Sequence, residues 1–269
     1  ESKKPADAAL AGLMALCATL TRYEGWFLLP FAGLFLLLCG GERRWRSAMA
    51  FCGVAAMGPL YWLAHNQIFY SNVLEFYNGP WSAKMIYQRQ LDSGLPRYPG
   101  DHDWGKAWQY YREAARLCAG TPALWLCVAG TIAALWRRAW WALALFALLP
   151  LFYVLSMYSS GTPIYVPHLW PNSHYNTRYG LNALMLGALC AGALVAVAPQ
   201  RWRAASAVAV AALAVWPWAL RPSPEAWVTW SESRANSESR RAWTRAASEY
   251  LEPRYKRGAG VFMPFGDLS

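Results

Sequence analysis

The sequence predicts an all-α polytopic membrane protein, and three observations lead to that fold class. Hydrophobic residues make up 56% of the 269 residues and charged residues only 15%, whereas an average soluble domain carries roughly 25% charged residues. The apolar residues gather in long runs. Short basic clusters separate several of these runs, as is typical of membrane topology. This composition excludes a disordered chain and argues against one soluble globular domain.

Seven apolar runs are the expected transmembrane helices, each of which needs about 20 residues to cross a bilayer. The runs cover residues 8–20, 27–39, 47–64, 121–136, 139–157, 181–198 and 204–220. The first two are short. They become long enough if the link at residues 21–26 lies at the membrane interface and forms part of both helices.

The basic clusters orient the seven spans. They precede the first run and follow the second, fourth and sixth runs, so strict alternation places all four on one side. The clusters are Lys3 and Lys4; Arg43, Arg44 and Arg46; Arg137 and Arg138; and Arg201 and Arg203. The positive-inside rule makes that side cytoplasmic. We therefore expect a multi-pass protein of the cytoplasmic (inner) membrane, with its active side extracytoplasmic.

The net charge of +10 does not indicate a nucleic-acid partner. A nucleic-acid-binding protein would carry its basic residues on a water-facing surface. Here many of them lie between apolar runs, where membrane lipid is the expected partner.

The segment at residues 65–120 is too long for a linker and is expected to form an extracytoplasmic loop. Residues 104–117 within it predict an amphipathic helix on the outer membrane surface, with Asp103 as its N-cap. Its apolar side is expected to carry Trp104, Trp108, Tyr111, Ala115 and Leu117. Residues 95–100 contain two prolines and a glycine, and predict a turn or extended link.

Two domains are expected. Residues 1–221 form the transmembrane helical domain, and residues 222–269 begin an extracytoplasmic C-terminal region. That region contains an exposed helix at 233–250 and a strand-like segment at 258–265. Because the chain starts with Glu and stops just after an apolar stretch, we expect it to be an internal piece of a larger protein.

The first candidate binding segment is the link at residues 21–26, where Arg22 and Glu24 interrupt an apolar region. Ionisable residues at a membrane boundary are costly unless they are paired, hydrated or functional. A functional role places Arg22 on a lipid phosphate and Glu24 near a sugar or a metal. A tight turn with an internal Arg–Glu pair explains the residues equally well.

The second candidate is the Asn-Gly-Pro turn at residues 78–80 and the residues that follow it. Trp81 is a candidate for stacking on a sugar ring, and Lys84 for contacting a phosphate. The alternative is a loop that lies on the lipid headgroups.

The third candidate is the outer loop at residues 167–179, which is rich in His, Asn and aromatic residues. Arg178 lies at the membrane edge, where a bidentate contact to phosphate is natural. His168 and His174 are candidates for phosphate or sugar contacts, and Tyr179 for a sugar face. The six-residue spacing between His168 and His174 matches no standard metal motif.

No metal site is predicted. Asp101-His102-Asp103 has ligand-type side chains, but a helix cap and solvated charges explain it better. The six cysteines form no CxxC pair and lie mostly inside apolar runs, so they indicate buried thiols rather than a zinc or disulfide framework.

At these segments the chain resembles the GT-C superfamily of polytopic glycosyltransferases, which includes protein O-mannosyltransferases and the lipid A aminoarabinose transferase. The resemblance rests on residues 20–26 followed by 28–30, at a break between two helices, and on 78–83 and 176–180. It covers most of residues 8–220. It implies transfer of a sugar from a polyprenyl-phosphate carrier to an acceptor on the outer face.

The chain departs from this superfamily in one respect that matters. The superfamily's catalytic carboxylate lies in a first extracytoplasmic loop near the amino terminus, and that loop is absent from this sequence. No catalytic residue can therefore be named, and we expect this piece alone to be inactive. A divalent metal as cofactor is left open, because many relatives work without one.

The alternative function is a transporter or flippase for a lipid-linked or anionic solute. A transporter is expected to carry ionisable residues near the bilayer midplane, and often paired repeats. The predicted spans are almost free of charge, and the polar clusters lie at the outer boundary. A membrane scaffold without activity is a third hypothesis.

Overall fold

The computed structural model describes residues 5–159, 161–219, 227–256 and 258–260, and over these residues the fold is all-α. The predicted cluster Lys3 and Lys4 and most of the predicted strand at 258–265 lie outside them. Over the described residues, each of the seven apolar runs is largely helical, but the run at 47–64 is divided between two helices that meet at Ala56. Within the described residues the only β pairing is a single bridge between Tyr165 and Tyr175.

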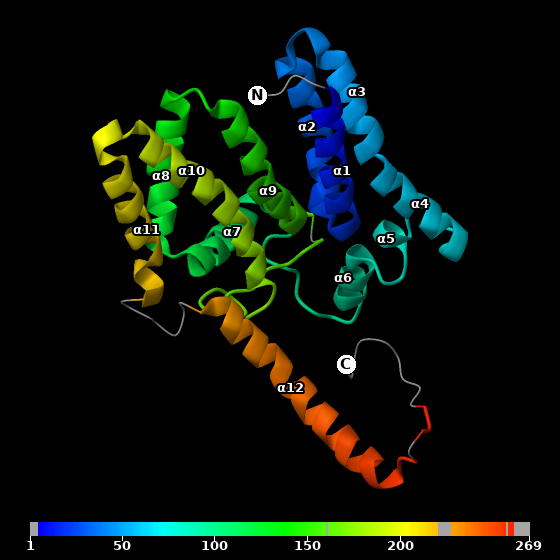
Figure 1. Cartoon of the computed structure of the whole chain (residues 1–269). Helices are drawn as coiled ribbons and strands as arrows, with labels where there is room; N and C mark the ends of the chain where they lie inside the picture. Colours follow the sequence, from blue (N-terminus) through cyan, green and yellow to red (C-terminus); the bar gives the residue numbers. More distant parts are fainter. Residues whose placement is uncertain (1–4, 160, 220–226, 257, 261–269) are drawn as a thin grey trace.

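The first group of helices comes from the amino-terminal third of the chain (Figure 1). It contains α1 (Pro5–Thr21), α2 (Tyr23–Cys39), η1 (Gly41–Arg43), α3 (Arg44–Ala55) and α4 (Met57–Tyr70). The predicted link at 21–26 is indeed part of both α1 and α2, since Arg22 alone separates them. The last helix runs to Tyr70, so the outer loop begins later than the predicted residue 65.

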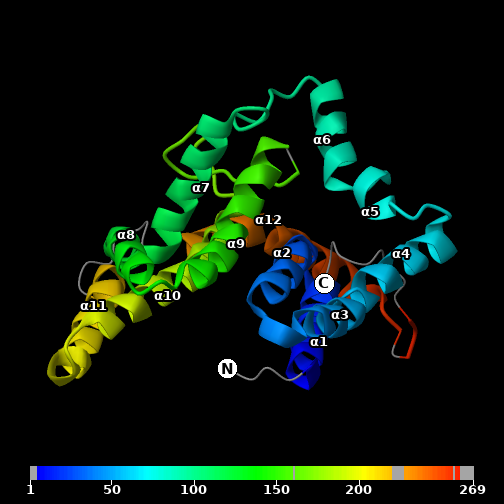
Figure 2. The same cartoon turned by 90° about the horizontal axis from the view of Figure 1, so that it is seen from above.

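The second group of helices follows residue 120 in the chain. It contains α8 (Thr121–Trp136), α9 (Trp140–Tyr158), η2 (Thr177–Asn182), α10 (Ala183–Val197), η3 (Gln200–Trp202) and α11 (Arg203–Ala219). Seen from above, the two groups lie beside each other, and α2 and α9 are the helices that join them (Figure 2).

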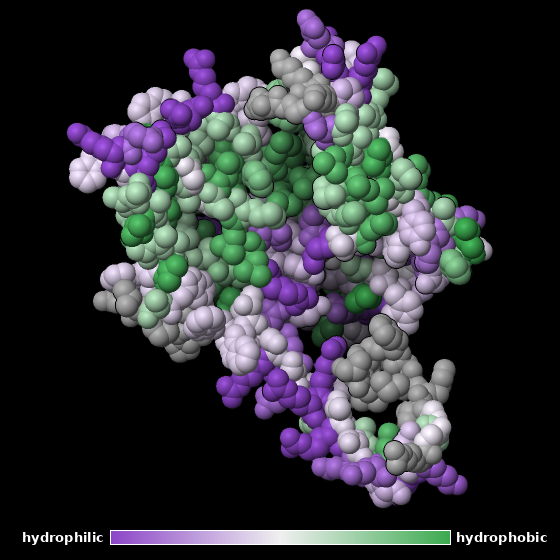
Figure 3. Space-filling model, viewed as in Figure 1, coloured by the Kyte–Doolittle hydropathy of each residue, from purple (hydrophilic) through white to green (hydrophobic). Residues whose placement is uncertain are grey.

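The turns that carry the basic clusters lie at one end of the molecule. The α2–α3, α8–α9 and α10–α11 turns are all at the top of Figure 1, and Figure 3 shows hydrophilic surface there above a hydrophobic band. Large apolar side chains of the helices are exposed, including Leu10, Met14, Ile132 and Val208. Such a band suits lipid better than water. The three basic clusters that lie within the described residues thus share one end of the molecule, in agreement with the prediction that they lie on one side.

Fewer helices meet strict criteria for a membrane span than the seven predicted. Among the described residues, three are long and apolar enough: Gly41–Tyr70, Trp140–Tyr158 and Thr177–Val197. Counting the bent pair α7 and α8 as one span makes four. The helices α1 and α2 are apolar but have only 17 residues each.

The opposite end of the bundle carries the segment between α4 and α8, with α5 (Glu75–Asn78), α6 (Ala83–Asp92) and α7 (Trp104–Ala119). As predicted, Asp103 caps α7, because its Oδ1 accepts a hydrogen bond from the Lys106 N–H at 2.9 Å. The axis of α7 turns by 108° from that of α8. Gly120 permits this turn with its φ of +81°, and α7 therefore lies across the end of the bundle.

The predicted apolar side of α7 was wrong in part. The buried side packs on α9 and η2 and forms the centre of the largest core cluster. Its buried residues are Ala107, Tyr110, Tyr111, Ala114, Ala115, Leu117, Cys118 and Ala119. Trp104 and Trp108 are about half exposed instead. The alanines allow the neighbouring backbones to approach, and Tyr110 and Tyr111 are buried beside them, whereas Trp104 stacks on Tyr158 near the start of the helix.

The predicted exposed helix in the C-terminal region is α12 (Val228–Leu251), followed by η4 (Glu252–Arg254). It projects away from the bundle in Figure 1. Only its first turns are anchored, since Val228 and Glu232 are its buried residues.

The close contact of α8 with α10 yields a first prediction. A Cβ on Gly130 would overlap the backbone carbonyl of Cys190, whereas one on Gly192 would meet open space. We expect Gly130→Ala to destabilise the protein by about 1–3 kcal/mol through overpacking. Thermal unfolding in detergent measures this loss of stability. Gly192→Ala is the matched control, and equal stability of the two variants would contradict the packing.

The common side of the basic turns yields a second prediction. Glu42 lies in the α2–α3 turn and Ser93 follows α6 at the opposite end. In a background without native cysteines, a membrane-impermeant thiol reagent added to intact cells should label Ser93→Cys and leave Glu42→Cys unlabelled. Labelling of Glu42→Cys in intact cells would contradict the predicted orientation and indicate the opposite one.

Candidate functional site

The break between α1 and α2 carries a paired arginine and glutamate. Gly25 makes the sharp reversal possible, because its Cα packs so closely on α1 that a Cβ would lie 2.8 Å from the Ala18 backbone. The Arg22 Nε donates to Glu24 Oε1 at 2.7 Å. The carboxylate is 8% exposed, whereas the Arg22 side chain is 54% exposed. The predicted internal pair is therefore present, with its cation open to solvent.

Tyr153 of α9 completes this pair. Its hydroxyl donates to Glu24 Oε1 and accepts from Arg22 Nη2 at 2.8 Å. A buried carboxylate is stable only when charges and hydrogen bonds compensate its lost hydration. The three side chains thus join the first helix group to the second at the outer end of the bundle.

The ring of Tyr179, in η2, is close to two arginines. The Arg22 guanidinium carbon is 5.0 Å from the centre of its ring, and the Arg178 guanidinium carbon is 5.1 Å from it. On the Tyr153 side the two tyrosine rings stack, with centroids 4.9 Å apart. Cation–π contacts of this kind hold guanidinium groups near an aromatic face. The ring therefore brings together two arginines that are far apart in the sequence.

A groove of about 920 Å³ opens beside this cluster. Its polar lining includes Arg22, Glu24, His174, Arg178 and Tyr179, five of the eight predicted binding residues. Its apolar lining comes from α6, α9 and the loops around them, through Ile86, Leu95, Pro96 and Phe152.

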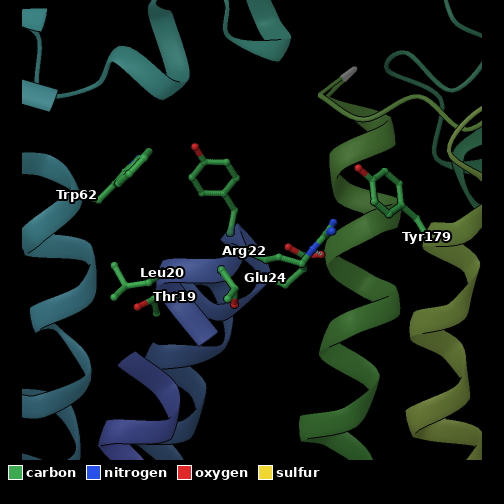
Figure 4. Close-up of a pocket in the computed structure, with 8 residues that line it drawn as sticks. Thr19, Leu20, Arg22, Glu24, Trp62 and Tyr179 are labelled. Atoms are coloured by element: carbon green, nitrogen blue, oxygen red, sulfur yellow. Dashed lines mark hydrogen bonds and ion pairs between the residues drawn. The ribbon is translucent and has the colours of Figure 1, made fainter. Parts of the chain in front are cut away.

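A smaller cavity of about 360 Å³ also lies at the α1–α2 break. Figure 4 shows Trp62 of α4 across it from Tyr179, with Arg22 and Glu24 between them. Thr19 also lines it. The Arg22–Glu24 pair thus borders both the groove and this cavity.

Three predicted binding residues do not line the groove. Trp81 is 78% exposed and stacks under the Arg89 guanidinium. Lys84 lies over the Tyr77 ring. His168 lies elsewhere, with its Nε2 2.6 Å from Glu113 Oε1. Their residue types suit phosphate or sugar, but the tertiary structure points them away from the groove.

The described residues contain no group of three or more His, Cys, Asp and Glu side chains arranged for a metal ion. In the Asp101-His102-Asp103 segment, Asp103 serves as the cap of α7, and Asp101 accepts from Tyr87 at 3.0 Å and contacts His102.

Two residues of the site were missed by the sequence analysis. Tyr153 is one aromatic residue in an apolar run, and only its place near the outer end of that run could have suggested a role. Glu232 is one of several acidic residues in a polar tail, but its carboxylate is buried and accepts from Arg178 Nη1 at 2.8 Å. No local pattern distinguishes it from its neighbours, since the contact is made across 54 residues.

The ion pairs of Glu113 yield a third prediction. Burial acts to raise its pKa, but hydrogen bonds and charges from Arg116 and His168 together outweigh that effect, so the pKa lies below its usual value of 4.5. The carboxylate therefore stabilises the fold fully above about pH 4.5, and this contribution is lost as the pH falls through the lowered pKa.

Thermal unfolding of wild type and Glu113→Gln from pH 7 to pH 3 measures this contribution. Wild type should be the more stable at pH 7, and the difference should shrink below pH 4.5. Glu249→Gln, at an exposed position of α12, is the control. A difference that is constant across this range would contradict the assignment.

Comparison with known proteins adds nothing to this geometry. No protein-family model, no curated protein and no solved structure matches the chain. The arrangement of the groove is therefore the basis for any statement about function.

Proposed function

We propose that the chain belongs to an integral-membrane glycosyltransferase of the GT-C type. The enzyme transfers a sugar from a polyprenyl-phosphate donor to an acceptor on the extracytoplasmic side. The observation that carries this proposal is the groove in which Arg22 and Arg178 flank Tyr179. The proposal includes the seven-span topology, with the basic turns in the cytoplasm.

The charges of the groove suit the phosphate of such a donor. Guanidinium groups bind phosphate with charge-assisted hydrogen bonds that are about twice as strong as neutral ones. Both arginine side chains are 54% exposed, although each is paired with a buried carboxylate. His174 adds a further polar group to the lining. A phosphate between these groups would be neutralised on more than one side.

The remaining lining suits the other two parts of a lipid-linked sugar. Tyr165 and Trp170 offer aromatic surface to a sugar ring. Ile86 and Phe152 offer apolar surface to a polyprenyl chain. Because the groove lies at the end of an apolar bundle, a lipid can bring its phosphate to that height while its tail stays in the bilayer.

The reaction we propose is displacement of the lipid phosphate at the anomeric carbon by an acceptor hydroxyl. A carboxylate that accepts the hydroxyl proton is needed. We assign no residue to this role, because the Glu24 and Glu232 carboxylates are buried and paired with arginines. Arg22, Arg178, His174 and Tyr179 are assigned to donor binding.

A transfer assay tests this function. Membranes that contain the full-length protein receive a radiolabelled polyprenyl-phosphate sugar, and label that leaves the lipid is followed. We expect Arg178→Ala to lower transfer by about tenfold to a hundredfold, because a hydrogen bond to a charged group is worth about 1.5–3 kcal/mol. Arg178→Lys should recover part of the transfer.

Arg112→Ala is the matched control, since Arg112 is exposed on α7 and does not line the groove. Equal losses in both variants, at equal expression, would remove the assigned role of Arg178. If wild type moves the lipid across the bilayer and transfers no label from any carrier tested, the protein is a flippase and the proposal fails.

A further inference from the structure

Glu232 is a buried carboxylate on the second turn of α12, and it is 3% exposed. Its Oε1 accepts from the Asn176 N–H and from Arg178 Nη1, each at 2.8 Å. Its Oε2 accepts from the Thr177 hydroxyl. Three consecutive residues of the outer loop thus converge on one carboxylate, which satisfies the strong requirement of a buried charge for partners.

The backbone of this segment is also held from other directions. The Asn176 side chain donates to the Pro163 carbonyl at 3.0 Å, and the backbone of Asn176 has a left-handed conformation with φ of +58°. The Cys118 thiol of α7 contacts the Thr177 carbonyl oxygen at 3.2 Å. The Cα of Arg178 therefore has a defined position, and its side chain is the adjustable part.

Glu232 restricts that side chain. An arginine side chain carries about 2 kcal/mol of rotamer entropy when it is unrestrained. The contact with Glu232 engages one of the five guanidinium N–H groups, while the side chain remains 54% exposed beside the groove. An arginine oriented before its ligand arrives loses less entropy on binding.

We propose that Glu232 is a positioning residue, which orients Arg178 for a phosphate-bearing lipid in the groove. The inference rests on the proposed function and assigns α12 a part in it. Because the carboxylate belongs to α12, docking of this helix and binding of the phosphate favour each other, and this coupling is reciprocal. The C-terminal helix thereby controls a site formed by other parts of the chain.

The charge of Glu232 also has an effect that opposes phosphate binding. A carboxylate close to Arg178 also lowers the positive potential that a phosphate meets, so its removal could strengthen binding. However, the charge of Glu232 is shared among three donors, and glutamine offers them one acceptor oxygen in place of two. We therefore expect the loss of orientation to dominate.

The experiment measures binding of decaprenyl phosphate and of neutral decaprenol to the full chain in lipid nanodiscs. Glu232→Gln should raise the Kd for decaprenyl phosphate about tenfold, which corresponds to about 1.4 kcal/mol. The Kd for decaprenol should not change. Glu238→Gln, the same substitution at an exposed position of α12, should leave both unchanged.

Two further variants separate positioning from charge and from folding. Glu232→Asp keeps the negative charge but is too short to reach all three partners, so it should also weaken binding of the phosphate. In an Arg178→Ala background, Glu232→Gln should cause no further loss, because the residue acts through Arg178.

The outcomes distinguish this inference from the proposed function. Unchanged or tighter phosphate binding in Glu232→Gln overturns the positioning role and leaves the function standing. An equal loss for decaprenol, or an equal loss in the Arg178→Ala background, shows a purely structural role and also overturns it. Selective loss without sugar transfer in the full-length protein supports the inference and removes the function. Wild type that binds no decaprenyl phosphate removes both.

Discussion

The need to pair buried carboxylates at the outer end of an apolar bundle organises this protein. Glu24 and Glu232 lie in different helices, and each is paired with an arginine whose other side borders the groove. The ring of Tyr179 contacts both arginines. Moving either carboxylate out of place would leave a charge with too little hydration and no partner. The Arg178–Glu232 pair and the contact of Tyr153 with Glu24 therefore hold together helices that are far apart in the chain.

The packing of the helices brings these pairs into register. Small residues permit close approach where the pairs are made: Gly25 lets α2 reverse tightly on α1, and Gly180 presses η2 against the backbone of Ala114. The α7 helix lies under η2 and supplies the largest buried cluster. A rigid support of this kind is what allows half-exposed arginines to keep a fixed orientation.

The functional proposal and the inference about α12 depend on the same arrangement but can fail separately. The groove combines two cations, several aromatic side chains and an apolar wall. Glu232 adds a contact from a helix that otherwise projects away from the bundle (Figure 1). If that contact orients Arg178, α12 contributes a functional residue to the site.

Local patterns determined the helices, the side shared by the basic turns and the Asp103 cap, because apolar length, charge clusters and capping act over a few neighbouring residues. The apolar runs overstated the number of spans that meet strict criteria, and hydrophobicity alone did not show that Trp104 and Trp108 stay half exposed. Which polar residues meet was decided only by the tertiary structure. His168 was drawn to Glu113, and Glu232 to Arg178, across more than 50 residues. A buried charge is paired with the opposite charge that the fold brings beside it. The spacing of the residues along the chain therefore does not reveal the partner.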